Sequence, residues 1–399
     1  MSDEDRESSL IWLNALWEEW QQDVTAARKL PGDSVSEYVE NVPARLRAVQ
    51  GDTAKLALEA GLVDELLSHE VVRDRLIALV GKNKKTHSYN AVNFRSYVGS
   101  ARARLERYQP TEKQVAVIVA VGGITTGNQP PGTIGSESLS KQLIKAREDA
   151  KVKAVVVRVD SGGGSMYASE VILREIERLK AAGKPVIASM GGVAASGGYY
   201  ISMAADEVFA SPGTLTGSVG ILGMLPTFQR SLASLGLNVD GVGTTSLSGG
   251  IRPDRALGEA AREALQLSIE NGYRTFVARV AQARNTSPEE IDKIARGRVW
   301  AGRDALEIGL IDKLGNLEDA IAAAAEKAGL GDDYSLRYME KELGFREKLL
   351  LSMLGRTGRV PVRQGPVGAL VQALDAQLRP LANMSDPAHR YALCFCEVW

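Results

Sequence analysis

The sequence predicts an α/β protein made of parallel β-α units, and two observations carry this prediction. Four short runs rich in β-branched residues have the length and apolar character of buried strands: residues 115–121, 152–159, 186–190 and 207–210. Between the second and third runs, residues 169–180 place apolar side chains at helical spacing. Because strands that alternate with helices are typical of a parallel sheet covered by crossover helices, we expect these segments to form the core of the fold.

Further helices are expected on both sides of this core. Apolar residues recur at helical spacing over six more segments: residues 10–28, 53–67, 71–80, 255–284, 288–296 and 303–308. The polar and basic residues 82–90 are expected to form a linker. From residue 331 onward the chain is expected to be helical and irregular.

The composition excludes several classes of partner and ligand. The chain has 399 residues, and its 48 Lys and Arg nearly balance its 49 Asp and Glu, which gives a net charge of −1. This balance argues against a nucleic acid or a lipid surface held by bulk charge. The two cysteines, Cys394 and Cys396, are too few for a four-thiolate zinc site, and we expect neither a metal nor another cofactor. Residues 1–7 lack the pattern of a signal peptide, and no run approaches the roughly 18 apolar residues of a membrane-spanning helix.

An internal repeat links the two ends of the chain. Residues 57–66 and 305–314 are identical at seven of ten positions, and residues 24–28 pair in the same order with residues 280–284. In both places a long helix precedes the same short motif, and this shared order argues against a chance match. We therefore interpret residues 10–80 as the C-terminal part, or tail, of a first copy that lacks its N-terminal part, or head.

This interpretation divides the chain into four parts. They are a helical tail of an incomplete first repeat (1–80), a linker (81–112), a complete β-α domain (113–330) and a C-terminal extension (331–399).

Two glycine-rich loops follow two of the expected strands, residues 160–165 and 191–200. Ligands bind at such strand ends in open parallel sheets. Neither loop has the spacing of a phosphate-binding motif, so the remaining alternatives are glycines that serve packing alone and a nucleophile site. In the second alternative Ser196, flanked by small residues, begins a helix whose free N–H groups favour an oxyanion. Gly197 would supply one such group, and Gly163 or Gly164 in the facing loop the other.

A serine nucleophile needs a base, and the core of this sequence offers none. His69, His87 and His389 all lie outside the β-α segment, and residues 185–292 contain no lysine. Arginine stays protonated and cannot substitute. The sequence therefore indicates a nucleophile whose base is missing from its surroundings.

No other charged residue named in this sequence is expected to serve as the base for Ser196. Three lysines have no sequence feature that brings them to Ser196: Lys29, Lys55 and Lys184. Asp160 and Asp206 are interpreted as structural carboxylates, and Tyr199, Tyr200 and Met203 indicate a pocket without charge.

Four motifs in order closely resemble the signal peptide peptidase A (protease IV) family in its long, two-copy form: residues 191–200, 214–220, 267–273 and 297–302. The resemblance covers nearly the whole chain. It implies a Clp-protease/crotonase-like fold and a serine endopeptidase with a Ser/Lys dyad, in which Ser196 is the nucleophile. It also implies cleaved signal peptides as substrates, a homo-oligomer, and a place on the periplasmic face of the bacterial inner membrane.

The sequence departs from the family pattern at two places. The lysine of the long form is expected upstream of the helix that begins near residue 10, so this chain starts too late to contain it, and the short-form position near residues 244–250 has no lysine either. Gly162 stands where the family has the proline of a Ser-Pro-Gly-Gly motif. Three functions stay open: the family's serine peptidase, a non-catalytic assembly or peptide-binding subunit, and a crotonase-like acyl-CoA enzyme.

Overall fold

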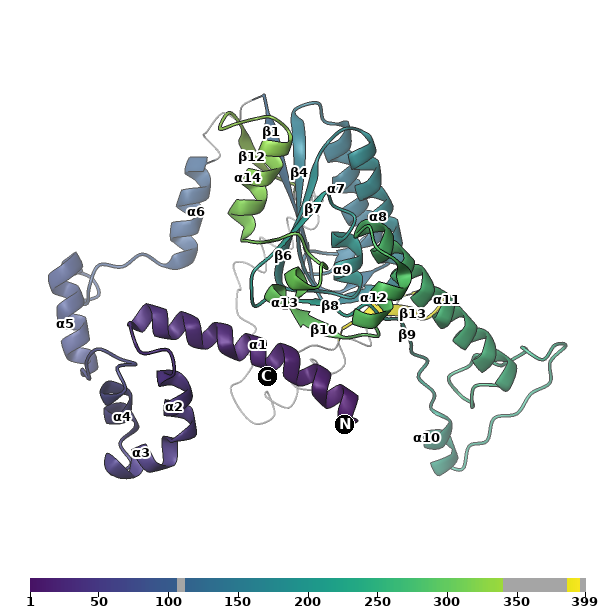
Figure 1. Cartoon of the computed structure of the whole chain (residues 1–399), viewed down its shortest axis with the longest axis horizontal. Helices are drawn as coiled ribbons and strands as arrows, with labels where there is room; N and C mark the ends of the chain where they lie inside the picture. The colour runs from purple at the N-terminus through teal and green to yellow at the C-terminus, as the bar shows by residue number, and fades with distance from the viewer. Residues whose placement is uncertain (106–111, 340–385, 395–399) are drawn as a thin grey trace. The chain divides into compact units, whose positions relative to one another are not determined.

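The computed structural model describes residues 1–105, 112–339 and 386–394 (Figure 1). Contacts divide the chain into two compact units. One comprises residues 13–109, and the other comprises residues 1–12 and 110–399.

A mostly parallel sheet forms the centre of the larger unit. Its strands are β1 (Gln114–Val121), β4 (Val152–Ser161), β6 (Val186–Ala195), β7 (Glu207–Ala210), β8 (Leu215–Gly217), β10 (Val299–Ala301), β11 (Lys313–Leu314) and β12 (Ser335–Met339). The main path runs β10-β8-β6-β4-β1-β12, β7 pairs with β6 and β11 pairs with β7, and among these described pairs only β10–β8 is antiparallel. This order confirms the α/β class and the four expected strands.

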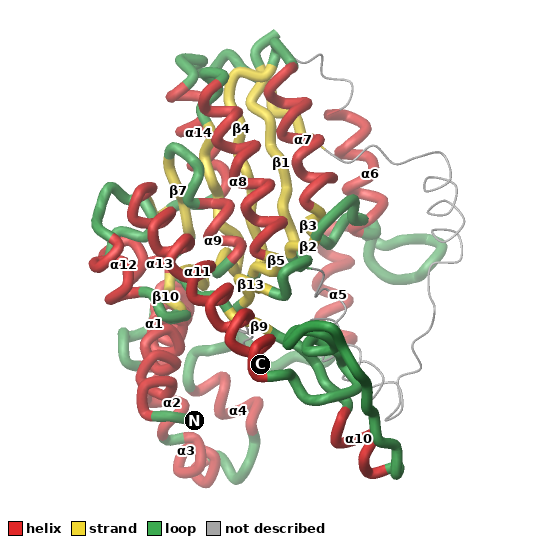
Figure 2. The backbone as a smooth tube through the Cα atoms, turned by 90° about the vertical axis from the view of Figure 1, so that its right-hand side faces the viewer, coloured by secondary structure: helices red, strands yellow, loops and turns green. Residues whose placement is uncertain are grey.

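Helices bury both faces of the sheet. The helices α7 (Ser136–Glu148) and α8 (Met166–Ala181) lie on one face, and α14 (Leu317–Lys327) lies on the other (Figures 1 and 2). Val155 and Val157 of β4 belong to the core on the α8 side, whereas Val156 belongs to the core on the α14 side. Since successive side chains of a strand point to opposite faces, burial on both faces explains why β4 reads as one continuous apolar run.

The larger unit contains further helices and a second sheet. The helices are α9 (Gly197–Ser202), α10 (Gln229–Ser234), α11 (Glu259–Ala283), α12 (Pro288–Ile294) and α13 (Gly302–Glu307). A small second sheet contains β2 (Ile124–Thr125), β3 (Ile134–Gly135), β5 (Gly163–Ser165), β9 (Leu222–Gly223) and β13 (Arg390–Leu393), in the order β3-β2-β5-β13-β9.

Two sequence-based expectations about strands were wrong. The strand expected to end at Met190 continues to Ala195, because its last three residues pair with β8. The described part of the stretch from residue 331 onward, expected to be helical and irregular, contains two strands, since β12 adds to the edge of the large sheet beside β1 and β13 joins the small sheet. Within the segment expected to be a linker (81–112), residues 94–105 form a helix, α6 (Phe94–Leu105), and the division of the chain into four parts stays a prediction.

The smaller unit is helical. It contains most of α1 (Asp3–Arg28), then α2 (Ser34–Glu40), α3 (Val42–Ala48), α4 (Thr53–Glu59), α5 (His69–Val80) and α6. The helix expected over residues 53–67 ends at Glu59, because Gly61 adopts a φ of 70°. In the part of the chain that the structure describes, no helix combines the length and the apolar character needed to cross a membrane.

The two copies of the repeat share local geometry. Arg28 pairs with Asp64 at 2.8 Å in the first copy, and the corresponding Arg284 pairs with Asp312 at 3.0 Å in the second. In each copy a residue of positive φ directly follows the arginine: Lys29 in the first and Asn285 in the second. The glycine of the repeated motif also has positive φ in both copies, at Gly61 and Gly309. These matched features support a common structural ancestry for the two segments. The headless first copy remains a prediction.

Candidate active site

Ser196 lies at a sharp turn between strand β6 and helix α9. Its backbone adopts φ 53° and ψ −115°, a region that residues with a side chain rarely occupy. Its backbone N–H donates to the Gly217 carbonyl at 2.7 Å, which ties the turn to β8. The sequence lacks the G-x-S-x-G pattern, yet the strand, strained serine and helix follow one another as in a nucleophile elbow.

Small residues around Ser196 allow the start of α9 to meet the first glycine-rich loop. A Cβ at Gly197 would lie 2.9 Å from Ser169 Oγ and 3.1 Å from the Gly163 Cα. A Cβ at Gly198 would overlap the Ser161 carbonyl oxygen. The two glycine-rich strand ends therefore come together, as expected from the parallel order of β4 and β6.

The loop after β4 presents its N–H groups unequally. Gly163 has a φ of 100° and Gly164 a φ of 155°. The Gly163 N–H donates to Ser161 Oγ at 3.0 Å, so it is already engaged. Gly164 is therefore the better candidate in this loop for a donor to an oxyanion. The sequence analysis could not choose between Gly163 and Gly164.

The Ser196 hydroxyl is buried and has no hydrogen-bond partner among the described residues; the whole residue is 1% exposed. An unpaired buried hydroxyl is costly and requires an explanation. No base contacts it in the described part of the chain.

Lys184, the lysine closest to Ser196 in the sequence, binds backbone carbonyl groups at the end of α7. Lys184 Nζ donates to the Ala146 carbonyl at 2.7 Å and to the Asp149 carbonyl at 2.6 Å. Burial lowers the pKa of Lys184. Because its ammonium group joins the end of α7 to the sheet, we assign it a structural role.

The two carboxylates near the loops bind backbone groups. Asp160 accepts a hydrogen bond from the Val193 N–H at 3.1 Å, and Asp206 accepts one from the Val186 N–H at 2.8 Å. Asp206 also pairs with Lys180 at 3.2 Å. These contacts agree with the structural role expected for both residues and remove the carboxylate pair that an acyl-CoA enzyme would need.

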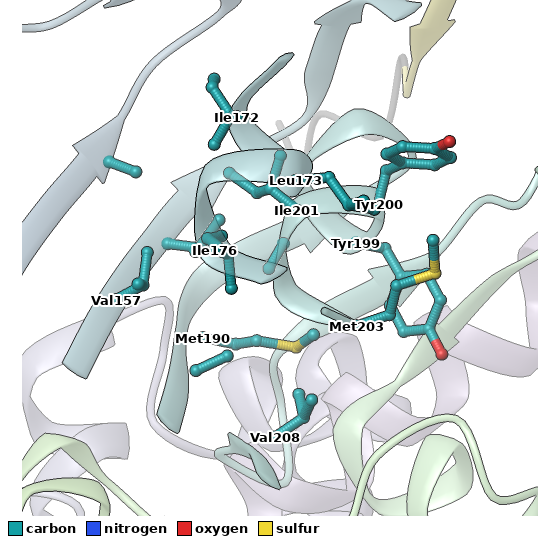
Figure 3. Packing of buried hydrophobic residues seen from close by; sticks show 14 of the residues in the cluster. Val157, Ile172, Leu173, Ile176, Met190, Tyr199, Tyr200, Ile201, Met203 and Val208 are labelled. Carbon is teal, nitrogen blue, oxygen red and sulfur yellow. The ribbon is translucent and has the colours of Figure 1, made fainter. Parts of the chain in front are cut away.

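The expectation that Tyr199, Tyr200 and Met203 line a pocket was wrong. They belong to the core between α8 and the sheet, where Figure 3 shows both tyrosines beside α9 among the other buried residues. Tyr199 donates to the Leu310 carbonyl, and Tyr200 donates to Glu170. Burial, followed by the hydrogen bond to Glu170, raises the pKa of Tyr200.

The sequence analysis missed a segment that reaches this site from the C-terminal extension. Strand β13 pairs with β5, the strand that contains Gly163 and Gly164. A cavity of about 820 Å³ adjoins its end, with Ser218, Ile221 and Leu393 among the lining residues. The only sequence signal was the short apolar run before Cys394, which is too brief to predict a strand.

Comparisons with known proteins identify the family. A family model described as peptidase family S49 matches residues 178–331. Protease 4 of Salmonella typhi is 40% identical over 400 residues, which cover 99% of this chain and 63% of that protein. "Putative protease slr0021" of Synechocystis sp. is 35% identical over 223 residues, which cover 56% of this chain and 77% of that protein.

The chain belongs to peptidase family S49. Together with the mixed α/β architecture, membership of this family confirms the Clp-protease-like fold class expected from the sequence. Among solved structures, a ClpP1 variant from Listeria monocytogenes is 19% identical with a TM-score of 0.35, over 56% of this chain and 99% of that one, a likeness too slight to add to the argument.

This S49 chain is shorter than the long relatives it matches. It spans 63% of Protease 4 from Salmonella typhi and 65% of Protease 4 from Haemophilus influenzae, which is 34% identical to it.

Proposed function

We propose that this chain carries the nucleophile of a serine endopeptidase, with Ser196 as the attacking residue. The observation that carries the proposal is the strained strand-to-helix turn at Ser196, packed against a glycine-rich loop. Strained backbone conformations cluster at active sites, where the surrounding structure holds a reactive group in place. The N–H groups of Gly197 and Gly164 are the donors for the oxyanion, and Gly163 shapes the loop.

In this mechanism Ser196 Oγ bonds to the carbonyl carbon of a peptide and its proton passes to a base. The C–N bond then breaks, the amine leaves with that proton, and water hydrolyses the resulting ester. The base is a lysine in a Ser/Lys dyad, as the family resemblance implies. No described residue of this chain contacts Ser196 Oγ as a base. Following the family resemblance, we propose that the lysine of the dyad is supplied by a first-copy segment upstream of the helix near residue 10 or by another chain.

The finer assignments follow the same resemblance. We propose cleaved signal peptides as substrates, a homo-oligomer as the working assembly, and the periplasmic face of the bacterial inner membrane as its location. The names of the relatives from Salmonella typhi and Haemophilus influenzae, both called Protease 4, support the peptidase class.

The test compares residues 1–399 with a version extended upstream across the lysine of the long form, on a small peptide amide. We expect the extended version to be about 10²–10⁴-fold faster, because that is the usual contribution of a general base. Ser196→Ala in both versions is the control. Equal turnover by the two versions, abolished by the control substitution in each, would show that a base lies within this chain.

A second candidate is a non-catalytic, peptide-binding subunit of an assembly. The unpartnered Ser196 hydroxyl favours it, since a serine without a base binds but does not cleave. Peptide binding without Ser196-dependent turnover in the extended version would select this alternative.

A further inference from the structure

Helix α9 follows Ser196 directly and is too short to hold the strained turn by itself. It has six residues, and the unfavourable φ and ψ of Ser196 persist only where the surrounding structure fixes them. The Tyr200 N–H donates to the Ser196 carbonyl at 2.8 Å, so Tyr200 lies one helical turn after the serine and on the same side of the helix. Contacts of the Tyr200 side chain therefore bear directly on the position of Ser196.

The Tyr200 side chain joins α9 to two other helices. Tyr200 is fully buried, and its ring packs edge-on against Phe276 of α11, with the ring centroids 4.9 Å apart. Its hydroxyl donates to Glu170 Oε2 of α8 at 2.6 Å. Hydrogen bonds to an ionised group are shorter and roughly twice as strong as those between neutral groups, so this bond is a firm link between α9 and α8.

Two arginines hold the acceptor of this hydrogen bond in place. Glu170 Oε1 pairs with Arg279 of α11 at 2.8 Å and with Arg174 of α8 at 2.8 Å. Arg279 also pairs with Glu177 at 3.1 Å, which fixes its own side chain. Because each oxygen of Glu170 has its own donor, the carboxylate cannot turn toward another partner without losing a bond.

This network acts on the candidate active site through α9. Among the described residues, none of its members forms a hydrogen bond with Ser196 Oγ. The Gly197 N–H, which we propose as an oxyanion donor, belongs to the first turn of α9, so a tilt of this helix moves Ser196 and Gly197 together relative to Gly164. Misplacement by about 1 Å from a change far from the chemistry can cost about 10²-fold in rate.

We propose that Tyr200, held by Glu170, is a positioning residue that keeps the Ser196 turn in its strained geometry. This inference rests on the proposed function in treating Ser196 as a nucleophile. The Tyr200 hydroxyl supplies the constraint, and its loss lets α9 shift and the turn relax. Removing the hydroxyl therefore costs less stability while Ser196 is strained, because relaxation of the turn returns part of the loss.

The first test measures this coupling by urea unfolding of residues 1–399. The four proteins are the wild type, Tyr200→Phe, Ser196→Gly and the double variant, and phenylalanine keeps the ring against Phe276. We expect Tyr200→Phe to raise the unfolding equilibrium constant by a larger factor in the Ser196→Gly background than in the wild type. The two factors should differ at least about twofold, the lower end for sites that interact. Additive effects would overturn the proposal.

Tyr273→Phe is the matched control for this cycle. It also removes a hydroxyl that donates to a carboxylate, that of Asp292 at 2.5 Å, but this bond joins α11 to α12 and leaves α9 untouched. Its effect should add to that of Ser196→Gly, and equal coupling for both tyrosines would overturn a specific role of Tyr200. Glu170→Gln repeats the cycle if Tyr200→Phe fails to fold.

The second test measures the reactivity of Ser196 in the version extended upstream across the lysine of the long form. A fluorophosphonate probe forms a bond from phosphorus to Ser196 Oγ, fluoride leaves, and the serine proton passes to the base. We expect Tyr200→Phe to lower the maximal labelling rate about 10–10²-fold and to leave the half-saturating probe concentration unchanged. Glu170→Gln keeps an acceptor for the hydroxyl and should lose less, and Ser196→Ala is the blank.

The outcomes of the two tests separate the two proposals. A maximal labelling rate that Tyr200→Phe leaves unchanged, or a change confined to the half-saturating concentration, would overturn the positioning role and leave the proposed function standing. Coupling in the first test without Ser196-dependent labelling of the unsubstituted extended version would uphold Tyr200 as the residue that holds the turn and overturn the nucleophile.

Discussion

Ser196 combines two features that stability alone would not select. Its φ and ψ are unfavourable for a residue with a Cβ, and its buried hydroxyl has no partner among the described residues. A glycine would fit the same turn without strain, and its neighbours Gly197 and Gly198 show that glycine is accepted next to it. The proposed role of Ser196 as a nucleophile explains why a serine occupies this position in spite of its cost in stability.

Replacing Ser196 should reveal this conflict as a gain in stability. We expect Ser196→Gly to raise the free energy of unfolding by about 1 kcal/mol, since strain of this kind costs about 1–3 kcal/mol and glycine loses part of that gain as backbone entropy. Ser196→Ala keeps the Cβ and should gain less. Urea unfolding of the three proteins measures the difference, and a Ser196→Gly variant less stable than Ser196→Ala would contradict the strain.

Tyr273 should make stability depend on alkaline pH. Burial, followed by its hydrogen bond to Asp292, raises the pKa of Tyr273 to about 12 from an ordinary value of 10. A group whose pKa is raised by folding contributes fully below its unfolded pKa, and the contribution is lost as pH rises from about 10 through 12. The urea midpoint of the wild type should therefore fall over this interval.

Tyr273→Phe is the comparison for this pH effect. The variant lacks the titrating hydroxyl, so its midpoint should fall less between pH 8 and pH about 11.5 than that of the wild type. Parallel curves for the two proteins would show that Tyr273 does not contribute.

At the scale of elements, the two copies of the repeat use the same ion pair in different surroundings. The Arg284 side chain is 9% exposed beside Asp312, whereas the Arg28 side chain is 28% exposed beside an Asp64 that is 82% exposed. Burial of one partner makes loss of the pair more costly, because the remaining charge is poorly solvated.

The two arginines should therefore respond differently to the same substitution. Arg284→Met should destabilise the larger unit by about 1–3 kcal/mol, since it removes the charged partner of Asp312, a carboxylate that also accepts from the Val208 N–H near the start of β7. Arg28→Met is the matched control and should have a smaller effect. Scanning calorimetry of both variants is the measurement, and equal losses would show that burial does not distinguish the copies.

At the scale of the whole molecule, exposed aromatic side chains on α1 predict self-association. Trp17 and Trp20 are 39% and 51% exposed, and their rings stack with centroids 5.2 Å apart. Trp12, on the same helix, is only partly exposed, so the exposed aromatic surface consists of Trp17 and Trp20. A paired apolar surface of this kind favours contact with another chain.

Light scattering after size exclusion tests this prediction. We expect the wild type to be larger than a monomer and the double variant Trp17→Lys, Trp20→Lys to shift toward a monomer. Val242→Lys, on an exposed loop of the larger unit, is the control and should leave the mass unchanged. A monomeric wild type would contradict the prediction.

The sequence by itself determined the core of this protein. The strands of the large sheet are buried on both faces, so they read as continuous apolar runs, and the long helices carry their own period. The meeting of Ser196 with the Gly163 loop was also predictable, since parallel neighbouring strands place their carboxyl ends at one edge.

Only the tertiary structure decided how the site is completed. β13 is four residues long, and its partners Gly163–Ser165 lie more than 200 residues away, so no local pattern encodes the pairing. The extension of β6 to Ala195, the engagement of the Gly163 N–H by Ser161 and the burial of Asp386 likewise depend on distant contacts. The periodicity of a sequence predicts which face of a helix or strand is buried. It does not predict which distant residues pair with a short strand or bind a buried carboxylate, because those partners are brought together only when the chain folds.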